Sequence, residues 1–102
     1  MPPSLRIAPS GQIAPTLHLN GSGLERLEQG LSDQIAALRA AREVMQANAP
    51  HPRDYYPQGE DAGLEARRQH QVRLSMLEKL VSELEEGYED LQRQAGERRK
   101  RT

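Results

Sequence analysis

The clearest hydrophobic pattern runs through the second half of the chain. Apolar side chains recur there at alternating spacings of four and three residues, which is the repeat of a helix that buries one stripe against a neighbouring helix. Charged residues occupy most of the remaining positions. The pattern predicts a helix over about residues 60–95, with a seam made of His70, Leu74, Leu77, Val81, Leu84, Tyr88, Leu91 and Ala95.

A similar pattern precedes it and predicts a first helix over about residues 22–48. Ser22 and Glu25 have the spacing of a capping box at its start. Pro50 ends it, because proline disfavours helical geometry in the residue before it. Alanines gathered in the second half of this helix would let another helix approach closely. The expected core-side residues are Leu24, Leu27, Leu31, Ile35, Leu38, Ala41, Val44 and Met45.

The segments outside the helices divide the chain. Residues 1–16 are rich in proline, which predicts a flexible arm unless a partner chain holds it. Residues 17–96 are the predicted hairpin domain, with a loop at 49–59 and Gly96 closing the second helix, and residues 97–102 are a basic tail. The predicted fold class is therefore all-α. We expect an antiparallel two-helix hairpin with an extended N-terminal arm, which assembles into an oligomeric helical bundle.

Residues 16–20 alternate between polar and apolar side chains. Alternation of this kind is typical of an extended segment, because successive side chains point to opposite sides. We therefore expect a short extended piece laid against the helix pair. Leu17 and Leu19 would face the helices, and His18 and Asn20 would face away.

Composition favours self-association and limits the available chemistry. Only 35% of the 102 residues are hydrophobic, with three tyrosines and no phenylalanine or tryptophan, so a monomer has little with which to enclose a core. A formal net charge of −1 favours neither nucleic acid nor a membrane surface as partner. The chain has no cysteine, no apolar run that would span a bilayer and no signal-peptide pattern. These features predict a soluble protein of the cytoplasm.

The loop between the helices concentrates the candidate chemistry. Pro52 and Pro57 bracket its polar and aromatic side chains and keep them off the helix faces. A guanidinium can pair with phosphate, a phenol ring can stack on a base, and a carboxylate can accept a hydrogen bond from a ribose or base edge. The candidate ligand-binding residues are Arg53, Asp54, Tyr55 and Tyr56, with help from His18 and Asn20.

The same loop has a purely structural interpretation. Tyr55 or Tyr56 can cap the end of the helical bundle, because most tyrosines bury a ring and satisfy a hydroxyl group. Arg53 can pair with Asp54 or with a helix terminus. The residues alone leave both interpretations open.

Catalysis and metal binding are not indicated. His18, His51 and His70 do not share a helix at the spacing of four residues that suits a metal ion, and no cysteine or acidic motif supports them. His70 falls on the seam and is interpreted as a polar residue that fixes helix register. No nucleophile motif and no phosphate-cradling glycine loop is present. We therefore expect a protein that is not an enzyme and needs no cofactor, with a basic tail that solubilises rather than binds nucleic acid.

Two stretches resemble a known group of proteins. Leu17-His-Leu-Asn-Gly21, the leucine- and alanine-rich helix and Arg53-Asp-Tyr-Tyr-Pro-Gln-Gly59 resemble small uncharacterised proteins encoded by phages and prophages of Gram-negative bacteria, over about residues 16–92. The Asp-Tyr-Tyr-Pro core is the distinctive part. The resemblance implies no established activity. Small phage-encoded helical hairpins include oligomeric sponges that sequester the cyclic nucleotides of bacterial immune signalling, and this analogy of architecture favours the nucleotide interpretation of the loop.

Two functional hypotheses follow. The first is a phage-encoded, non-enzymatic anti-defence sponge that sequesters a signalling nucleotide near residues 51–59, in the cytoplasm of the host cell. The second is a phage accessory module that inhibits or organises a host or virion protein. Both expect a homo-oligomer without membrane association.

Overall fold

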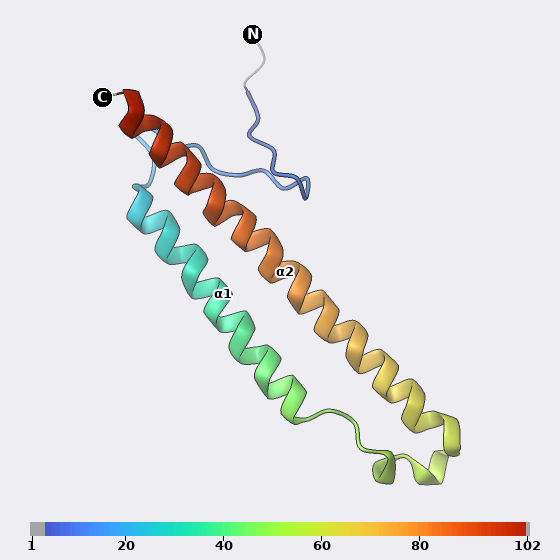
Figure 1. Ribbon diagram of the computed structural model, residues 1–102. Helices are drawn as coiled ribbons and strands as arrows, with labels where there is room; N and C mark the ends of the chain where they lie inside the picture. Colours follow the sequence, from blue (N-terminus) through green and yellow to red (C-terminus); the bar gives the residue numbers. More distant parts are fainter. Residues whose placement is uncertain (1–3, 102) are drawn as a thin grey trace.

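The computed structural model describes residues 4–101, of which Arg101 is described by its backbone alone. Two long helices run antiparallel and are joined by a loop at one end, while the N-terminal arm lies towards the other end (Figure 1). The molecule measures 67 × 28 × 20 Å along its principal axes. The all-α hairpin with an extended arm is confirmed, whereas its assembly into an oligomer stays a prediction. The elements are α1 (Leu24–Ala47), the 3-10 turns η1 (Pro52–Asp54) and η2 (Tyr56–Gln58), and α2 (Glu60–Arg101).

The seam predicted for α2 is the line along which the two helices pack. Leu91 has no exposed surface, and Leu74 and Ala95 are 6% and 8% exposed. The other predicted seam residues are buried or half-buried. Gly87 belongs to the same line, because a Cβ added there would stand 3.7 and 3.9 Å from the methyl carbons of Leu31 in α1. The predicted seam is thus confirmed over its whole length.

The predicted end of α2 at Gly96 is wrong, because the helix continues to Arg101. One glycine costs a helix only about 1 kcal/mol relative to alanine. Ala95, directly before it, is buried and lines one small groove together with Leu17 and Leu24. This packing outweighs the local preference of glycine. Residues 97–101 of the predicted basic tail are therefore helical, and the last residue of the chain lies outside the described residues.

The predicted capping box at the start of α1 does not form. Gly23, not Ser22, is the capping residue, and no side chain accepts a hydrogen bond from the first turn. The carbonyl of Gly23 accepts from the backbone N–H of Leu27 at 3.1 Å. The helix therefore begins at Leu24, two residues later than predicted, and the box is out of register because Glu25 stands only two residues after the cap.

The buried face of α1 departs from the predicted repeat at two residues. Ala41 and Val44 are exposed, Val44 at 63%, so their predicted place in the core is wrong. The repeat continues instead through Arg42, which is half-buried and pairs with Glu78 of α2 at 2.6 Å. Its aliphatic stem can cover the seam while its charge reaches the surface. The confirmed core-side residues of α1 are Leu24, Leu27, Leu31, Ile35, Leu38 and Met45.

A cluster of polar side chains attaches the N-terminal arm to the C-terminal half of α2. The Arg6 guanidinium donates two hydrogen bonds to the Asp90 carboxylate, at 2.5 and 2.8 Å. Gln94, one turn further along α2, accepts from the backbone N–H of Leu17 and donates to the carbonyl of Pro15, both at 2.9 Å. It also donates to Asp90 at 2.9 Å. We refer to Arg6, Asp90 and Gln94 as the clasp.

Beyond the clasp the arm folds back on itself in a tight turn. Ile7 and Ile13 form an isolated antiparallel bridge across this turn. Gly11 has a φ of 93°, a conformation that side chains other than glycine rarely adopt. The Gln12 side chain donates to the backbone carbonyl of Glu83 at 2.5 Å. The turn is therefore fixed both internally and to α2.

The arm also contributes to the core. Ala14 is only 5% exposed, and it lines a groove with residues of both helices. The arm that the sequence predicts to be flexible unless a partner holds it is thus held, from Arg6 onwards, by α2 of its own chain. Residues 1–3 of the predicted arm lie outside the described residues.

The short extended piece before α1 agrees with the prediction at Leu17 but not at Leu19. Leu17 is half-buried, but Leu19 is 93% exposed, so its predicted packing against the helices is wrong. The carbonyl of His18 accepts from the backbone N–H of Gly21 at 3.2 Å, which closes a turn. This turn ends the alternation before Leu19 can reach the helix pair.

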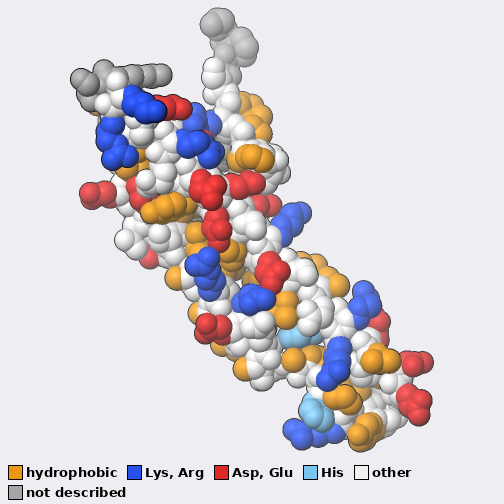
Figure 2. Space-filling view, viewed as in Figure 1, with side chains coloured by type: hydrophobic (Ala, Val, Ile, Leu, Met, Phe, Trp, Pro, Cys, Tyr) orange, Lys and Arg blue, Asp and Glu red, His pale blue; other side chains and the backbone are white. Residues whose placement is uncertain are grey.

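Charged side chains of both signs lie over both helices, with hydrophobic side chains between them (Figure 2). Neither α1 nor α2 offers, within the described residues, an apolar stretch that could cross a bilayer.

The clasp predicts an acid-sensitive contribution to stability. The hydrogen bond from Arg6 holds the pKa of Asp90 below its ordinary value of 3.8. Because the folded pKa is the lower one, the contact stabilises the fold above the unfolded pKa and is lost as the pH falls through the folded pKa. We expect Arg6→Ala to lower the free energy of unfolding at neutral pH by about 1–2 kcal/mol. Urea denaturation followed by circular dichroism at a series of pH values measures both effects.

The matched control is Arg73→Ala, which removes an exposed guanidinium of α2 that forms no ion pair in the described chain. In Arg6→Ala the free energy of unfolding should also fall less as the pH drops below about 4. A smaller fall should remain, because hydrogen bonds from Ser10 and Gln12 lower the pKa of Glu86 as well. Equal stability of the two variants across this pH range would show that the clasp does not hold the arm.

Candidate functional site

Local residue preferences build the loop at the tip of the hairpin. Each 3-10 turn has a proline in its first two positions. The Nδ1 atom of His51 accepts from the backbone N–H of Arg53 at 3.1 Å and so caps η1. Gly59 ends η2 with a φ of 103°, which lets the chain turn directly into α2. The loop backbone is therefore fixed by prolines, a histidine cap and one glycine.

The two loop tyrosines have different environments. Tyr55 is half-buried, and its Cβ lies 3.9 Å from where a Cβ on Gly63 of α2 would stand. Pro52 lies on the same spot, with its Cα at 3.6 Å. Tyr56 is 73% exposed. The structural interpretation of the loop thus fits Tyr55, whereas the ring of Tyr56 is free for a partner.

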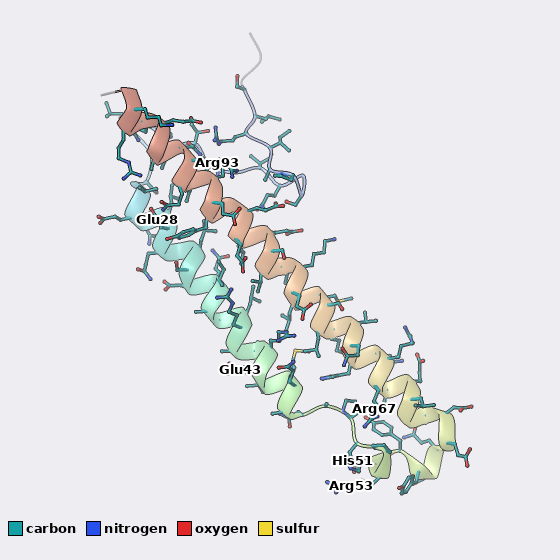
Figure 3. All side chains as sticks on the ribbon, viewed as in Figure 1. Glu28, Glu43, His51, Arg53, Arg67 and Arg93 are labelled. Atoms are coloured by element: carbon teal, nitrogen blue, oxygen red, sulfur yellow. The ribbon has the colours of Figure 1, made fainter. Side chains whose placement is uncertain are left out.

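The charged pair of the loop is not self-neutralised. Arg53 and Asp54 are both exposed, and neither forms an ion pair within the described chain. Figure 3 shows His51 and Arg53 on the loop at the tip of the hairpin, and Arg67 on the part of α2 that follows the loop. The expected pairing of Arg53 with Asp54 is therefore not formed, and the tip presents both an uncommitted guanidinium and an exposed phenol ring.

His18 and Asn20 do not join these residues. They precede α1 and lie at the end of the molecule opposite the loop (Figure 1). The His18 ring lies over Gly21, where its Nε2 would be 2.7 Å from an added Cβ. The structure thus brings Arg53, Asp54 and the loop tyrosines together at the tip and leaves His18 and Asn20 far away. A pocket containing all six residues cannot form within one copy.

The half of the seam nearer the tip contains buried nitrogen atoms without partners. His70 is 7% exposed, and its Nε2 has no hydrogen-bond partner in the described chain. The same is true of Nε of Arg42. Buried polar atoms usually have hydrogen-bond partners. The buried side chains Asp90 and Gln94 under the arm have them, whereas these two nitrogen atoms nearer the tip do not. His70 lies on the seam as predicted, and its role in fixing helix register stays a prediction.

A groove of about 290 Å³ runs between the helices away from the tip. Ile35 and Ala36 supply its apolar wall, and Arg39 pairs across it with Glu85 at 2.9 Å. Tyr88 lies at its edge, where a hydrogen bond to the Glu28 carboxylate raises the pKa of the phenol. Small-molecule pockets usually measure about 300–1,000 Å³ and bury most of the ligand. At about 290 Å³ the groove lies just below the lower end of this range.

The contacts that sequence reasoning missed belong to the clasp. Asp90 is 7% exposed and Gln94 is 6% exposed. Their spacing of four residues places them on one face of α2, but the sequence does not reveal which segment would cover that face. Arg6 stands 84 positions before Asp90. The one available signal was a pair of polar residues beside the seam residues Leu91 and Ala95.

The described residues contain no group of three or more His, Cys, Asp or Glu side chains that could hold a metal ion. No protein-family model, curated protein or solved structure matches the chain.

The two tyrosines should respond differently to truncation. We expect Tyr55→Ala to lower the free energy of unfolding by about 1–2 kcal/mol, because it removes a half-buried ring. Tyr56→Ala serves as the matched control and should change stability by less than about 0.5 kcal/mol. Thermal denaturation of both variants measures the difference. A larger loss for Tyr56→Ala would mean that the roles of the two rings are reversed.

Proposed function

We propose that the protein is a non-enzymatic interaction module that works as a homo-oligomer, in which α1 of one copy packs against α1 of another. The observation that carries this proposal is the surface that one copy leaves uncovered. The accessible surface is 7946 Å², whereas a compact protein of 11.5 kDa exposes about 5,800 Å². The excess of roughly 2,100 Å² is enough for two interfaces of standard size, each of which removes about 800 Å² from each partner.

The shape of the chain supports the same conclusion. Its radius of gyration is 19.9 Å, against about 13 Å for a compact domain of this length. Leu91 is the one large side chain of the described residues that is fully buried. A hairpin with so small a core gains stability by covering its outer faces with another copy.

One face of α1 is suited to such a contact. Ala37, Ala40, Ala41 and Val44 are all exposed and recur at three- and four-residue spacing, so they lie on one side of the helix. Small side chains let two helices approach closely. The face carries no charge of its own, so a second copy of the same face can meet it without burying an unpaired ion. Two hairpins joined in this way form a four-helix bundle.

An assembled bundle presents more than one tip to a binding partner. Each tip carries the exposed Arg53, Asp54 and Tyr56, residue types that recognise proteins through ion pairs and aromatic contact. The resemblance of the tip sequence to phage and prophage proteins supports a role as an accessory factor in the host cytoplasm. There the bundle would inhibit or organise a host or virion protein.

A charge placed on the α1 face should weaken self-association. We expect Val44→Glu to reduce the association constant by about tenfold or more, because a carboxylate would enter an apolar contact without a partner. Gln46→Glu is the matched control, since it adds the same charge to an exposed position outside that face. Sedimentation velocity at several concentrations measures both. An unchanged average mass for Val44→Glu, with unchanged helicity, would overturn the proposed contact.

A second candidate function is the sequestration of a phosphorylated small ligand, such as a signalling cyclic nucleotide. The free guanidinium of Arg53 and the exposed ring of Tyr56 favour it, because together they can pair with phosphate and stack on a base. His18 and Asn20 lie at the other end of each copy, so they could contribute only from a neighbouring copy. This candidate therefore also requires the oligomer.

Ligand binding at the tip is tested by thermal shift with cyclic dinucleotides, cyclic trinucleotides and ADP-ribose derivatives. A ligand at 100 times its dissociation constant should add about 2.7 kcal/mol of stability. Arg53→Ala should reduce the shift more than Arg53→Lys, because lysine keeps the charge and loses the bidentate geometry. Arg73→Ala, distant from the tip, should leave the shift unchanged. If no compound shifts the wild-type protein, the interaction module remains and the nucleotide candidate fails.

A further inference from the structure

An exposed apolar stripe runs along the middle of α2. It lies on the same side of the helix that the arm covers nearer the C-terminus, at Glu83 and Asp90. Val72, Met76 and Leu80 follow one another at four-residue spacing and so lie on one face. They are 42%, 60% and 47% exposed. Glu83 and Asp90, at seven-residue intervals after Met76, continue the same line, and both are bound by the arm. The arm thus covers the C-terminal part of the stripe and leaves its middle bare.

Three further apolar side chains are exposed near the two ends of this stripe. Ile7 and Ile13, which form the bridge of the arm, are 61% and 68% exposed. Leu64, in the second turn of α2, is 67% exposed. The backbone N–H of Ser10 donates to the Glu86 carboxylate at 3.3 Å and so places the turn of the arm beside that residue. Apolar groups therefore stand on both sides of Met76.

These groups are arranged almost symmetrically about Met76. Leu64 lies twelve residues before it, about 18 Å along the helix, and Glu86, beside the arm, lies ten residues after it, about 15 Å. The 22 residues between Leu64 and Glu86 leave them about 40° apart around the helix, on one flank. If a second copy packs antiparallel about a twofold axis at Met76, like flanks lie on the same side of the pair. The arm of the second copy then approaches the first turns of α2, the region in which Leu64 lies.

The charges along α2 favour the antiparallel direction. Arg68 and Glu86 are eighteen residues apart, which is five full turns, so both project on the same flank. They stand eight residues before and ten residues after Met76, so the twofold axis brings each close to the opposite charge of the other copy. Arg68 now pairs only with the exposed Glu65 at 2.7 Å, a contact that is easily exchanged. A parallel pair would place the acidic residues Glu83, Glu86 and Asp90 against themselves.

We propose that two copies pair antiparallel along this stripe about a twofold axis at Met76. Val72 of each copy faces Leu80 of the other, and the arm of each approaches the first turns of α2 of the other. This contact is separate from the α1 face of the proposed function and does not depend on it. Two different twofold contacts on one chain allow a closed tetramer. The surface left uncovered by one copy is large enough for both.

Disulfide trapping tests the position of the axis, because the chain has no cysteine of its own. Single-cysteine variants of the full chain are oxidised with copper phenanthroline at micromolar concentration and separated on non-reducing gels. Met76→Cys should form dimers about tenfold faster than Gln71→Cys, whose exposed position lies about 140° away around α2. Circular dichroism checks that each variant is folded.

A mixing experiment fixes the register. Two copies of Val72→Cys should crosslink poorly, because the axis separates them by eight residues, about 12 Å, while a disulfide needs Cα atoms about 4.4–6.8 Å apart. The same holds for Leu80→Cys alone. An equal mixture of the two variants should yield the mixed dimer. Equal crosslinking of Met76→Cys and Gln71→Cys, or Val72→Cys alone matching the mixture, would overturn the proposal.

A combined variant separates this proposal from the α1 contact. Val44→Glu with Met76→Cys should crosslink as fast as Met76→Cys alone, since Val44 lies on the other helix and on another face. Loss of the crosslink only in the combined variant would show that the α2 contact is not independent, and would overturn it. Sedimentation of Val44→Glu tests the α1 contact by itself.

Discussion

A pair of α-helices can bury only the stripe along which the two helices touch, so a third layer is needed before any side chain is enclosed on all sides. In this chain the N-terminal arm supplies that layer over the C-terminal half of α2. Leu91, beneath it, is fully buried, and Ala14 of the arm is nearly so. Nearer the tip the loop packs on α2 only at its first turns, around Gly63, and Met76 stays 60% exposed. The fully buried Leu91 therefore lies under the arm, whereas His70 and Leu74 are buried between the helices nearer the tip.

The clasp determines where this third layer lies. Burying Asp90 and Gln94 would be costly without partners, but Arg6 and the backbone of the arm satisfy both groups. Hydrogen bonds of this kind are directional, so they fix the register of the arm on α2 in a way that apolar contact alone would not. The same register leaves the bridge of Ile7 and Ile13 pointing away from the core, exposed. One polar contact thus orders the arm and creates an apolar surface on it.

The surfaces proposed for assembly and for partner binding lie on different parts of the molecule. The helix faces carry exposed alanines, Val44 and the stripe around Met76, which suit a second copy of the chain. The tip carries Arg53, Asp54 and Tyr56, which are exposed and uncommitted. Since the tip is supported by Tyr55 and Pro52 on Gly63, its side chains can meet a partner without disturbing the helices.

The sequence by itself determined the hairpin, because a seven-residue repeat of apolar side chains specifies helices and their buried side without reference to any other segment. Every predicted seam residue of α2 is buried or half-buried, and the loop follows from Pro52, Pro57 and Gly59. Tertiary structure alone decided the docking of the arm, the continuation of α2 through Gly96 and the separation of His18 and Asn20 from the tip. Contacts such as Arg6 with Asp90 join residues 84 positions apart, and no local preference or periodicity encodes such a pairing.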